Sequence, residues 1–203
     1  MTTSLTERED LQIKSGSPST RLTVADLEQL QGILCEAHLD YQLELVDGKI
    51  IIRGPSDIVS SEIGAELVSL LRNWVKPRKL GRVFESSGGF ILPNSNVTAP
   101  DVSFVTASRL KQSKRYFAEL VPDLVVEIKS QSDRLKPLRE KIQSFIELGA
   151  KVGILIDPDK RTVTIYTPKA EPVVLRDGDL ISLPELLPGW EIAVTELWPI
   201  DFE

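Results

Sequence analysis

Seven residues in the middle of the chain, 123–129 with the sequence DLVVEIK, restrict the possible fold more than any other segment. Their apolar run is typical of a strand that other elements cover on both faces. Because side chains alternate along a strand, we expect Glu127 and Lys129 to project from one face and Val126 and Ile128 from the other. Charge is costly to bury unless it is paired or bound to a metal, so the Glu127 face is a candidate functional site.

Four further segments have the pattern of helices. The first follows Thr23 and Asp26, which form the pattern of a capping box, and carries leucines at helical spacing. The second should end near Pro77, because proline removes a backbone donor and clashes with the preceding turn. Helices are predicted over residues 24–37, 58–74, 108–120 and 138–148.

Short β-rich runs occupy most of the remaining chain. The runs YQLELV and KIIIR flank Asp47-Gly48, a combination that is the strongest short-range signal for a hairpin. Further strands are predicted in GRVFE, GFIL, VSFV, VGILIDP, RTVTIYT, PVVL and DLISL. This order of elements predicts a mixed α/β (α+β) domain in which helices flank a β-sheet and extra hairpins are attached.

Composition limits the function. The chain has 203 residues, 41% of them hydrophobic and 27% charged, with a formal net charge of −6. We expect a flexible arm over residues 1–20 and a single domain over 21–203. No apolar run is long enough to span a membrane and the N-terminus lacks the pattern of a signal peptide, so a cytoplasmic protein is expected. The acidic balance argues against a protein that coats nucleic acid through bulk charge.

Few residues offer nucleophilic or histidine-based chemistry. Cys35 is the only cysteine, so an intramolecular disulfide is excluded, and its place on an apolar helix predicts a packing role. His38 is the only histidine, which largely excludes triads and histidine-based metal sites. No glycine-rich phosphate-binding motif is present, so no nucleotide cofactor is expected.

Two carboxylates on predicted strands point to a metal site. Asp101 follows Pro100 at the start of VSFV, and Glu127 precedes Lys129 by two residues. Hard cations such as Mg²⁺ or Mn²⁺ take oxygen ligands, and a nearby lysine can orient water and stabilise charge on a phosphate. The simpler interpretation is an ordinary ion pair between Glu127 and Lys129 at a solvated strand end.

The order Pro100-Asp101, then Glu127-Ile128-Lys129, resembles the PD-(D/E)xK nuclease superfamily. More closely, residues 22–198 resemble the Uma-type restriction endonuclease family, a domain-of-unknown-function family of that superfamily. The resemblance implies a restriction endonuclease-like core. The residues that carry it are ELVDGKII (44–51), APDVSFV (99–105), PDLVVEIKS (122–130), the helix around Lys141, and GILIDPDKRTVTIY (153–166).

The resemblance implies a role for each matching residue. Asp101 and Glu127 would hold the metal with the backbone carbonyl of Ile128, and Lys129 would position the attacking water. Glu44 matches an acidic residue that can help to hold a second metal, although a solvated strand residue is an equally good interpretation. Lys141 matches a helix position that can contact a phosphate or brace the carboxylates, with a surface lysine as the alternative.

Two positions depart from the family pattern. Val59 stands near the place of a histidine found in many relatives, and Phe145 stands where a tyrosine is frequent.

Basic residues form three local clusters despite the negative total, and solvated helix ends and loops are the default interpretation. If the fold is that of the family, the third cluster lies near the metal site, and Arg134 and Lys136 could then contact a phosphate backbone together with Lys141. The clusters are Lys76, Arg78, Lys79 and Arg82; Arg109, Lys111, Lys114 and Arg115; and Arg134, Lys136, Arg139 and Lys141.

These features predict a metal-dependent endonuclease that hydrolyses DNA phosphodiester bonds. The alternatives are a catalytically inactive DNA-binding or oligomeric module of the same fold, and a structural protein unrelated to nucleic acid. A homodimer is expected, because enzymes that cut both strands often pair two sites and because Trp190 and Trp198 lie in an apolar C-terminal segment.

Overall fold

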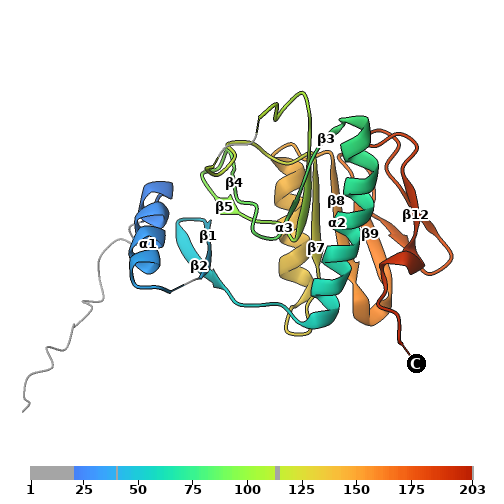
Figure 1. The fold of residues 1–203 in the computed structure, drawn as a ribbon, viewed down its shortest axis with the longest axis horizontal. Coiled ribbons are helices and arrows are strands. Elements are labelled where there is room, and N and C mark those ends of the chain that lie inside the picture. The colour runs from blue at the N-terminus through green and yellow to red at the C-terminus, as the bar shows by residue number, and fades with distance from the viewer. Residues whose placement is uncertain (1–20, 40, 113–114, 203) are drawn as a thin grey trace, which may run out of the picture.

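The computed structural model describes residues 21–39, 41–112 and 115–202. The expected arm over residues 1–20 lies outside the described residues. A six-stranded mixed sheet forms the centre of the molecule (Figure 1). Its strands, in spatial order, are β10 (Val173–Leu175), β9 (Thr162–Tyr166), β8 (Val152–Asp157), β7 (Leu124–Ile128), β6 (Val102–Thr106) and β3 (Gly81–Glu85).

The middle of this sheet is the segment that the sequence marks as buried. Every residue of β7 and β8 is buried, and the two strands are parallel, with Val126 opposite Ile154. Helix α3 (Leu135–Glu147) connects them and covers one face, where its Phe145 packs with Val125. Helix α2 (Ile58–Arg78) covers the opposite face, where Val126 and Ile128 join its apolar residues. The predicted two-sided coverage of β7 is thus confirmed.

The N-terminal part of the chain forms a smaller unit at one end of the molecule (Figure 1). Helix α1 (Val24–Glu36) begins with the predicted capping box of Thr23 and Asp26. It packs against the hairpin of β1 (Gln42–Val46) and β2 (Lys49–Arg53). Asp47 and Gly48 both have positive φ, as this two-residue turn requires. With β5 (Val97–Thr98) and β4 (Phe90–Ile91), the hairpin makes a sheet in the order β2-β1-β5-β4.

The C-terminal part covers the same face of the central sheet as α2. A ribbon of β11 (Leu180–Ser182) and β12 (Glu191–Ala193) is followed by a short 3-10 helix, η2 (Val194–Leu197). Trp190 and Trp198 are buried in the core that this ribbon shares with α2, so they do not form an exposed apolar surface. Another short 3-10 helix, η1 (Pro158–Lys160), joins β8 to β9.

The structure corrects three expectations. The described part of residues 108–120 forms turns, bends and an isolated bridge at Ala118 instead of a helix. The Leu110 and Lys111 carbonyls accept hydrogen bonds from Arg82, and Ala118 pairs with the backbone at Gly89 and Ile91. Helix α2 continues past Trp74, the last residue of the expected range, and ends at Arg78, one residue after Pro77. Cys35 is exposed and has no packing role.

No helix in the described ranges is long and apolar enough to cross a membrane.

Candidate active site

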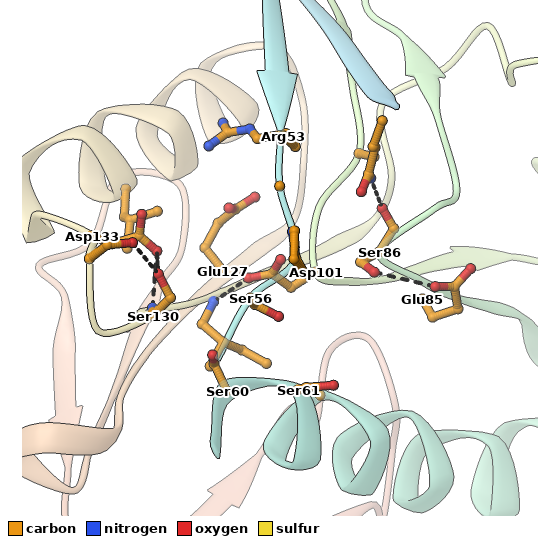
Figure 2. A pocket seen from close by; sticks show the side chains of 18 of the residues that line it. Arg53, Ser56, Ser60, Ser61, Glu85, Ser86, Asp101, Glu127, Ser130 and Asp133 are labelled. Carbon is orange, nitrogen blue, oxygen red and sulfur yellow. Dashed lines mark hydrogen bonds between the residues drawn. The ribbon is translucent and has the colours of Figure 1, made fainter. Parts of the chain in front are cut away.

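A pocket of about 890 Å³ opens at the carboxyl end of β7. Its lining comes from the start of β1, the end of β2, the start of α2, the end of β3, the segment between β5 and β6, the end of β7 with the loop that follows it, and α3. In Figure 2, Arg53 lies above Asp101 and Glu127, while Ser60 and Ser61 lie below them at the start of α2. The pocket therefore joins residues that are far apart in the sequence around two carboxylates.

Asp101 and Glu127 form the floor of this pocket. Glu127 is 3% exposed, and the backbone N–H of Ile128 donates to Asp101 Oδ2 at 2.7 Å. Burial raises the pKa of Glu127 to about 7, and the nearby charge of Asp101 adds to this shift, although Lys141 opposes it. Burial also raises the pKa of Asp101, against the effect of the Ile128 N–H. Two crowded carboxylates of this kind gain stability when a cation approaches.

Lys141 supplies the nearest positive charge, from the middle of α3. Its Nζ lies 2.9 Å from Glu127 Oε1 and 3.2 Å from Glu44 Oε1. Burial works against the ammonium, but Glu127 and Glu44 outweigh this effect and raise the pKa of Lys141. Lys141 is therefore charged and fixed between two carboxylates, and the surface interpretation of this lysine is wrong.

Glu44 is 1% exposed, so its interpretation as a solvated strand residue is also wrong. Its oxygens accept hydrogen bonds from Arg53 Nε at 2.8 Å, the Ala99 N–H at 2.9 Å and Lys141 Nζ at 3.2 Å. Burial would raise the pKa of Glu44, but Lys141, Ala99 and Arg53 together lower it. Glu44 thus holds the two cationic side chains of the site, and its oxygens are occupied.

Lys129 is not brought to the carboxylates. It follows the last residue of β7, and its backbone N–H continues the pairing with β8 by donating to Ile156 O at 2.9 Å. This places its ammonium beside η1, where it donates to Asp159 Oδ2 at 2.7 Å and to Ser130 O at 3.1 Å. Lys129 does not line the pocket.

Two other predicted phosphate-binding residues also lie away from the pocket lining. Arg134 is the exposed N-cap residue of α3, and its side chain makes no capping hydrogen bond. Lys136 points into solvent and faces Glu140 at 3.8 Å. Of the third basic cluster, only Lys141 lines the pocket.

Sequence reasoning missed Arg53, which lines the pocket and pairs with Glu44. The hairpin sequence could have predicted the Arg53–Glu44 contact. The two-residue turn fixes the register, so that Glu44 faces Ile51 and Arg53 is the diagonal neighbour of Glu44 on the same face.

It also missed Asp57, the N-cap of α2. The Asp57 carboxylate accepts the N–H of Ser60 at 3.0 Å and that of Gln131 at 2.9 Å, which ties the start of α2 to the loop after β7. The two positions that depart from the family pattern are also placed: Val59 is exposed outside the pocket lining, and Phe145 is buried in the core.

The residues present fit a divalent cation. Glu127 Oε1 is buried, faces the Lys141 ammonium and has no aligned hydrogen-bond donor. Among the described residues, no group of three or more acidic, histidine or cysteine side chains forms a complete cage. Mg²⁺ is usually held by one or two carboxylates and keeps waters or substrate phosphates as its other ligands, and Asp101 and Glu127 offer such carboxylates. Ile128, whose carbonyl was expected to join the ligands, lines the same pocket.

The fold is a mixed α/β domain with a restriction endonuclease-like core. The family Uma2, described as "Putative restriction endonuclease", matches residues 24–195, and the chain belongs to this family.

A solved structure agrees with this assignment. The chain is similar to the crystal structure of a putative nuclease belonging to DUF820 from Anabaena variabilis ATCC 29413. The two are 26% identical, the match covers 80% of this chain and 94% of that chain, and the TM-score is 0.70. A match to DrdV in a DrdV–DNA complex has 17% identity and a TM-score of 0.40, and covers 85% of this chain and 13% of that chain. A comparison with curated proteins finds no match.

Proposed function

We propose that this protein is a metal-dependent endonuclease that hydrolyses DNA phosphodiester bonds. The observation that carries the proposal is the group of Asp101, Glu127 and Lys141 on the floor of an open pocket. Membership of a restriction endonuclease family and similarity to a nuclease structure support a nuclease-type function. Mg²⁺ or Mn²⁺ is the proposed cofactor, because both carboxylates offer the hard oxygen ligands that these ions prefer.

Asp101, Glu127 and the Ile128 carbonyl would hold the cation. When bound, it would polarise the phosphodiester and lower the pKa of a water molecule. Lys141 is placed to orient a water or stabilise charge on a phosphate oxygen. Glu44 is a positioning residue, because it holds Lys141 and Arg53 without a free oxygen of its own. Arg53 is 44% exposed in its side chain and can direct its remaining donors to a phosphate.

In this proposal Lys141 takes the role that the sequence suggests for Lys129. The ammonium of Lys141 lies 2.9 Å from Glu127, whereas that of Lys129 lies 2.7 Å from Asp159. A group that positions water at the scissile phosphate must reach the carboxylate floor, and of these two lysines Lys141 does so.

The test is nicking of supercoiled plasmid by purified protein in Mg²⁺ or Mn²⁺. The near-isosteric Asp101→Asn and Glu127→Gln variants should lower the rate by about a hundredfold or more, because each removes a ligand charge. Lys141→Gln should do the same, and Lys129→Gln should keep most of the activity. Circular dichroism melting would check that each variant folds.

Nicking that survives in Asp101→Asn and Glu127→Gln would contradict the proposal. If Lys129→Gln loses nicking activity while Lys141→Gln keeps it, the lysine that positions water is Lys129, as the sequence suggests.

A second candidate is an inactive DNA-binding or oligomeric module. The observation that favours it is the pairing of Lys129 with Asp159, which leaves the lysine of the E-x-K pattern outside the pocket. Calorimetric titration separates the two. Mg²⁺ or Mn²⁺ binding that disappears in Asp101→Asn supports the enzyme, whereas no binding at millimolar metal supports the module.

The homodimer also remains a prediction. One reason for expecting a dimer was an apolar C-terminal segment with Trp190 and Trp198, and both side chains are buried within one chain. The other reason, paired active sites, stays, and light scattering after size-exclusion chromatography would test the oligomeric state.

A further inference from the structure

A basic depression of about 340 Å³ lies between the end of α2 and the edge strand β3. Arg72, Val75 and Lys76 line it from α2, and residues 81–84, including Arg82, line it from β3. No acidic side chain is among these lining residues. We call this depression, with the α2 face that leads to it from the pocket, the α2–β3 groove.

The depression and the active-site pocket lie along the same face of α2. Ser61, Ala65 and Val68 line the pocket, and Arg72 and Lys76 line the depression. These positions are three or four residues apart, so they form a single stripe on the helix. At about 1.5 Å of rise per residue, Ser61 and Lys76 are separated by about 22 Å. That distance equals about six nucleotide steps at duplex spacing.

The charge of the groove fits a polyanion. Arg72 and Lys76 are exposed, and neither forms an ion pair within the described residues. The Arg82 guanidinium is held by the carbonyls of Leu110 at 3.2 Å and Lys111 at 3.1 Å, which fixes its position beside the groove. Cations that lack protein partners along a path from a phosphodiester site are placed to meet phosphates.

β3 also contributes its backbone. In the described part of the chain it pairs only with β6, so the other edge of β3 is open toward the groove. Backbone N–H groups on an open edge can donate to phosphate oxygens or to another strand. The charged side chains that line the depression are all basic, which favours the phosphate.

We infer that the α2–β3 groove binds the phosphate backbone of the nucleic-acid strand that extends from the active-site pocket, through Arg72 and Lys76. This inference rests on the proposed nucleic-acid substrate. It does not require that the strand is cleaved, so binding and cleavage can fail separately.

Fluorescence anisotropy with single-stranded DNA in EDTA tests the inference without cleavage. The double variant Arg72→Gln/Lys76→Gln should weaken binding of an oligonucleotide of about 20 residues by about tenfold. It should also lower the slope of log Kd against log salt by about 1.4, because two phosphate contacts are lost. An oligonucleotide of about three residues, which is too short to reach from the pocket to Arg72 and Lys76, should bind both proteins within about twofold.

Lys169→Gln/Arg176→Gln is the matched control. It removes one lysine and one arginine charge from exposed positions beside β10, at the opposite edge of the sheet. An equal loss of affinity in the two double variants would assign the effect to net charge and overturn the inference. The inference would also be overturned if the affinity for the longer oligonucleotide changed neither with the groove substitutions nor with the salt concentration. If the variants bind as expected but plasmid nicking fails, the groove stands and the endonuclease proposal falls.

Discussion

Opposing electrostatic effects act on the Glu127 carboxyl group. Burial and the charge of Asp101 raise its pKa to about 7, whereas Lys141 lowers it. Below about pH 7 the Glu127 carboxyl is therefore largely protonated, and above it the carboxylate is available to a cation. The nearby Glu44 pairs with the same lysine but has a lowered pKa, because it also receives Arg53 and the Ala99 N–H. Two similar carboxylates thus acquire different roles from their hydrogen-bond partners.

Asp123, directly before β7, is buried for a structural reason. It accepts the Thr106 N–H at 2.9 Å and pairs with Arg109 at 3.0 Å and Lys151 at 3.1 Å. Burial would raise the pKa of Asp123, but Thr106, Lys151 and Arg109 outweigh it and hold the pKa below the ordinary value of 3.8.

We expect Asp123→Asn to lower the free energy of unfolding by about 1–3 kcal/mol at neutral pH. A depressed pKa in the folded protein stabilises it above the unfolded-state pKa, and the contribution is lost as pH falls through the folded-state pKa. The difference between wild type and variant should therefore be constant above about pH 5 and shrink below about pH 4. Urea unfolding across this range measures it. Asp201→Asn, at an exposed position, is the control, and a difference that grows toward acid pH would contradict the prediction.

At the scale of elements, the placement of Lys141 depends on how closely α3 lies on β8. Gly153 in β8 permits this approach, since a Cβ there would lie 2.4 Å from Ile142 Cγ2 of α3. Ile142 immediately follows Lys141, so a displaced helix would move the ammonium relative to Glu127 and Glu44.

We expect Gly153→Ala to destabilise the protein by about 1–3 kcal/mol through overpacking. It should also lower plasmid nicking more than the loss of folded protein explains, because α3 carries Lys141. Denaturant unfolding and initial nicking rates at a temperature where both proteins are folded would measure the two effects.

Gly32→Ala is the matched control. It lies inside α1 with nothing within 4 Å of the added Cβ, so it should leave nicking unchanged and stabilise the helix by up to about 1 kcal/mol. Full activity in Gly153→Ala would show that α3 does not position the site.

At the scale of the whole molecule, the pocket forms only when several parts of the chain are folded together. The hairpin supplies Glu44 and Arg53, the residue directly before β6 is Asp101, β7 supplies Glu127, and α3 supplies Lys141. A ligand that binds this pocket should therefore stabilise the native chain as a whole, because the unfolded chain does not hold these groups together.

We expect Mg²⁺ or Mn²⁺ at about 100 times its Kd to add about 2.7 kcal/mol to stability. For a chain of this size the Tm should then rise by about 5–10 °C, and EDTA should reverse the rise. Differential scanning fluorimetry would record it. Asp101→Asn should show no such rise, whereas Asp201→Asn should behave as wild type. A metal-dependent rise that persists in Asp101→Asn would place the cation elsewhere.

Local patterns were enough to predict the elements that depend on neighbouring residues. The capping box at Thr23, the turn at Asp47-Gly48 and the apolar run of β7 each contain their own structural signal. The helix expected over residues 108–120 does not form. Its Leu110 and Lys111 carbonyls accept hydrogen bonds from Arg82 and Ala118 pairs with Phe90, and no pattern within the segment contains these contacts.

The sequence by itself determined the family, the buried strand and the carboxylates Asp101 and Glu127, because short-range periodicity and motif spacing carry that information. Only the tertiary structure decided which lysine accompanies them. Lys129 is two residues from Glu127 in sequence but pairs with Asp159, whereas Lys141 reaches Glu127 and Glu44 from α3. The physical reason is that charge pairing acts through space: the packing of α3 on β8 and the register of the β1–β2 hairpin set the distances, and neither is encoded next to the residues they join.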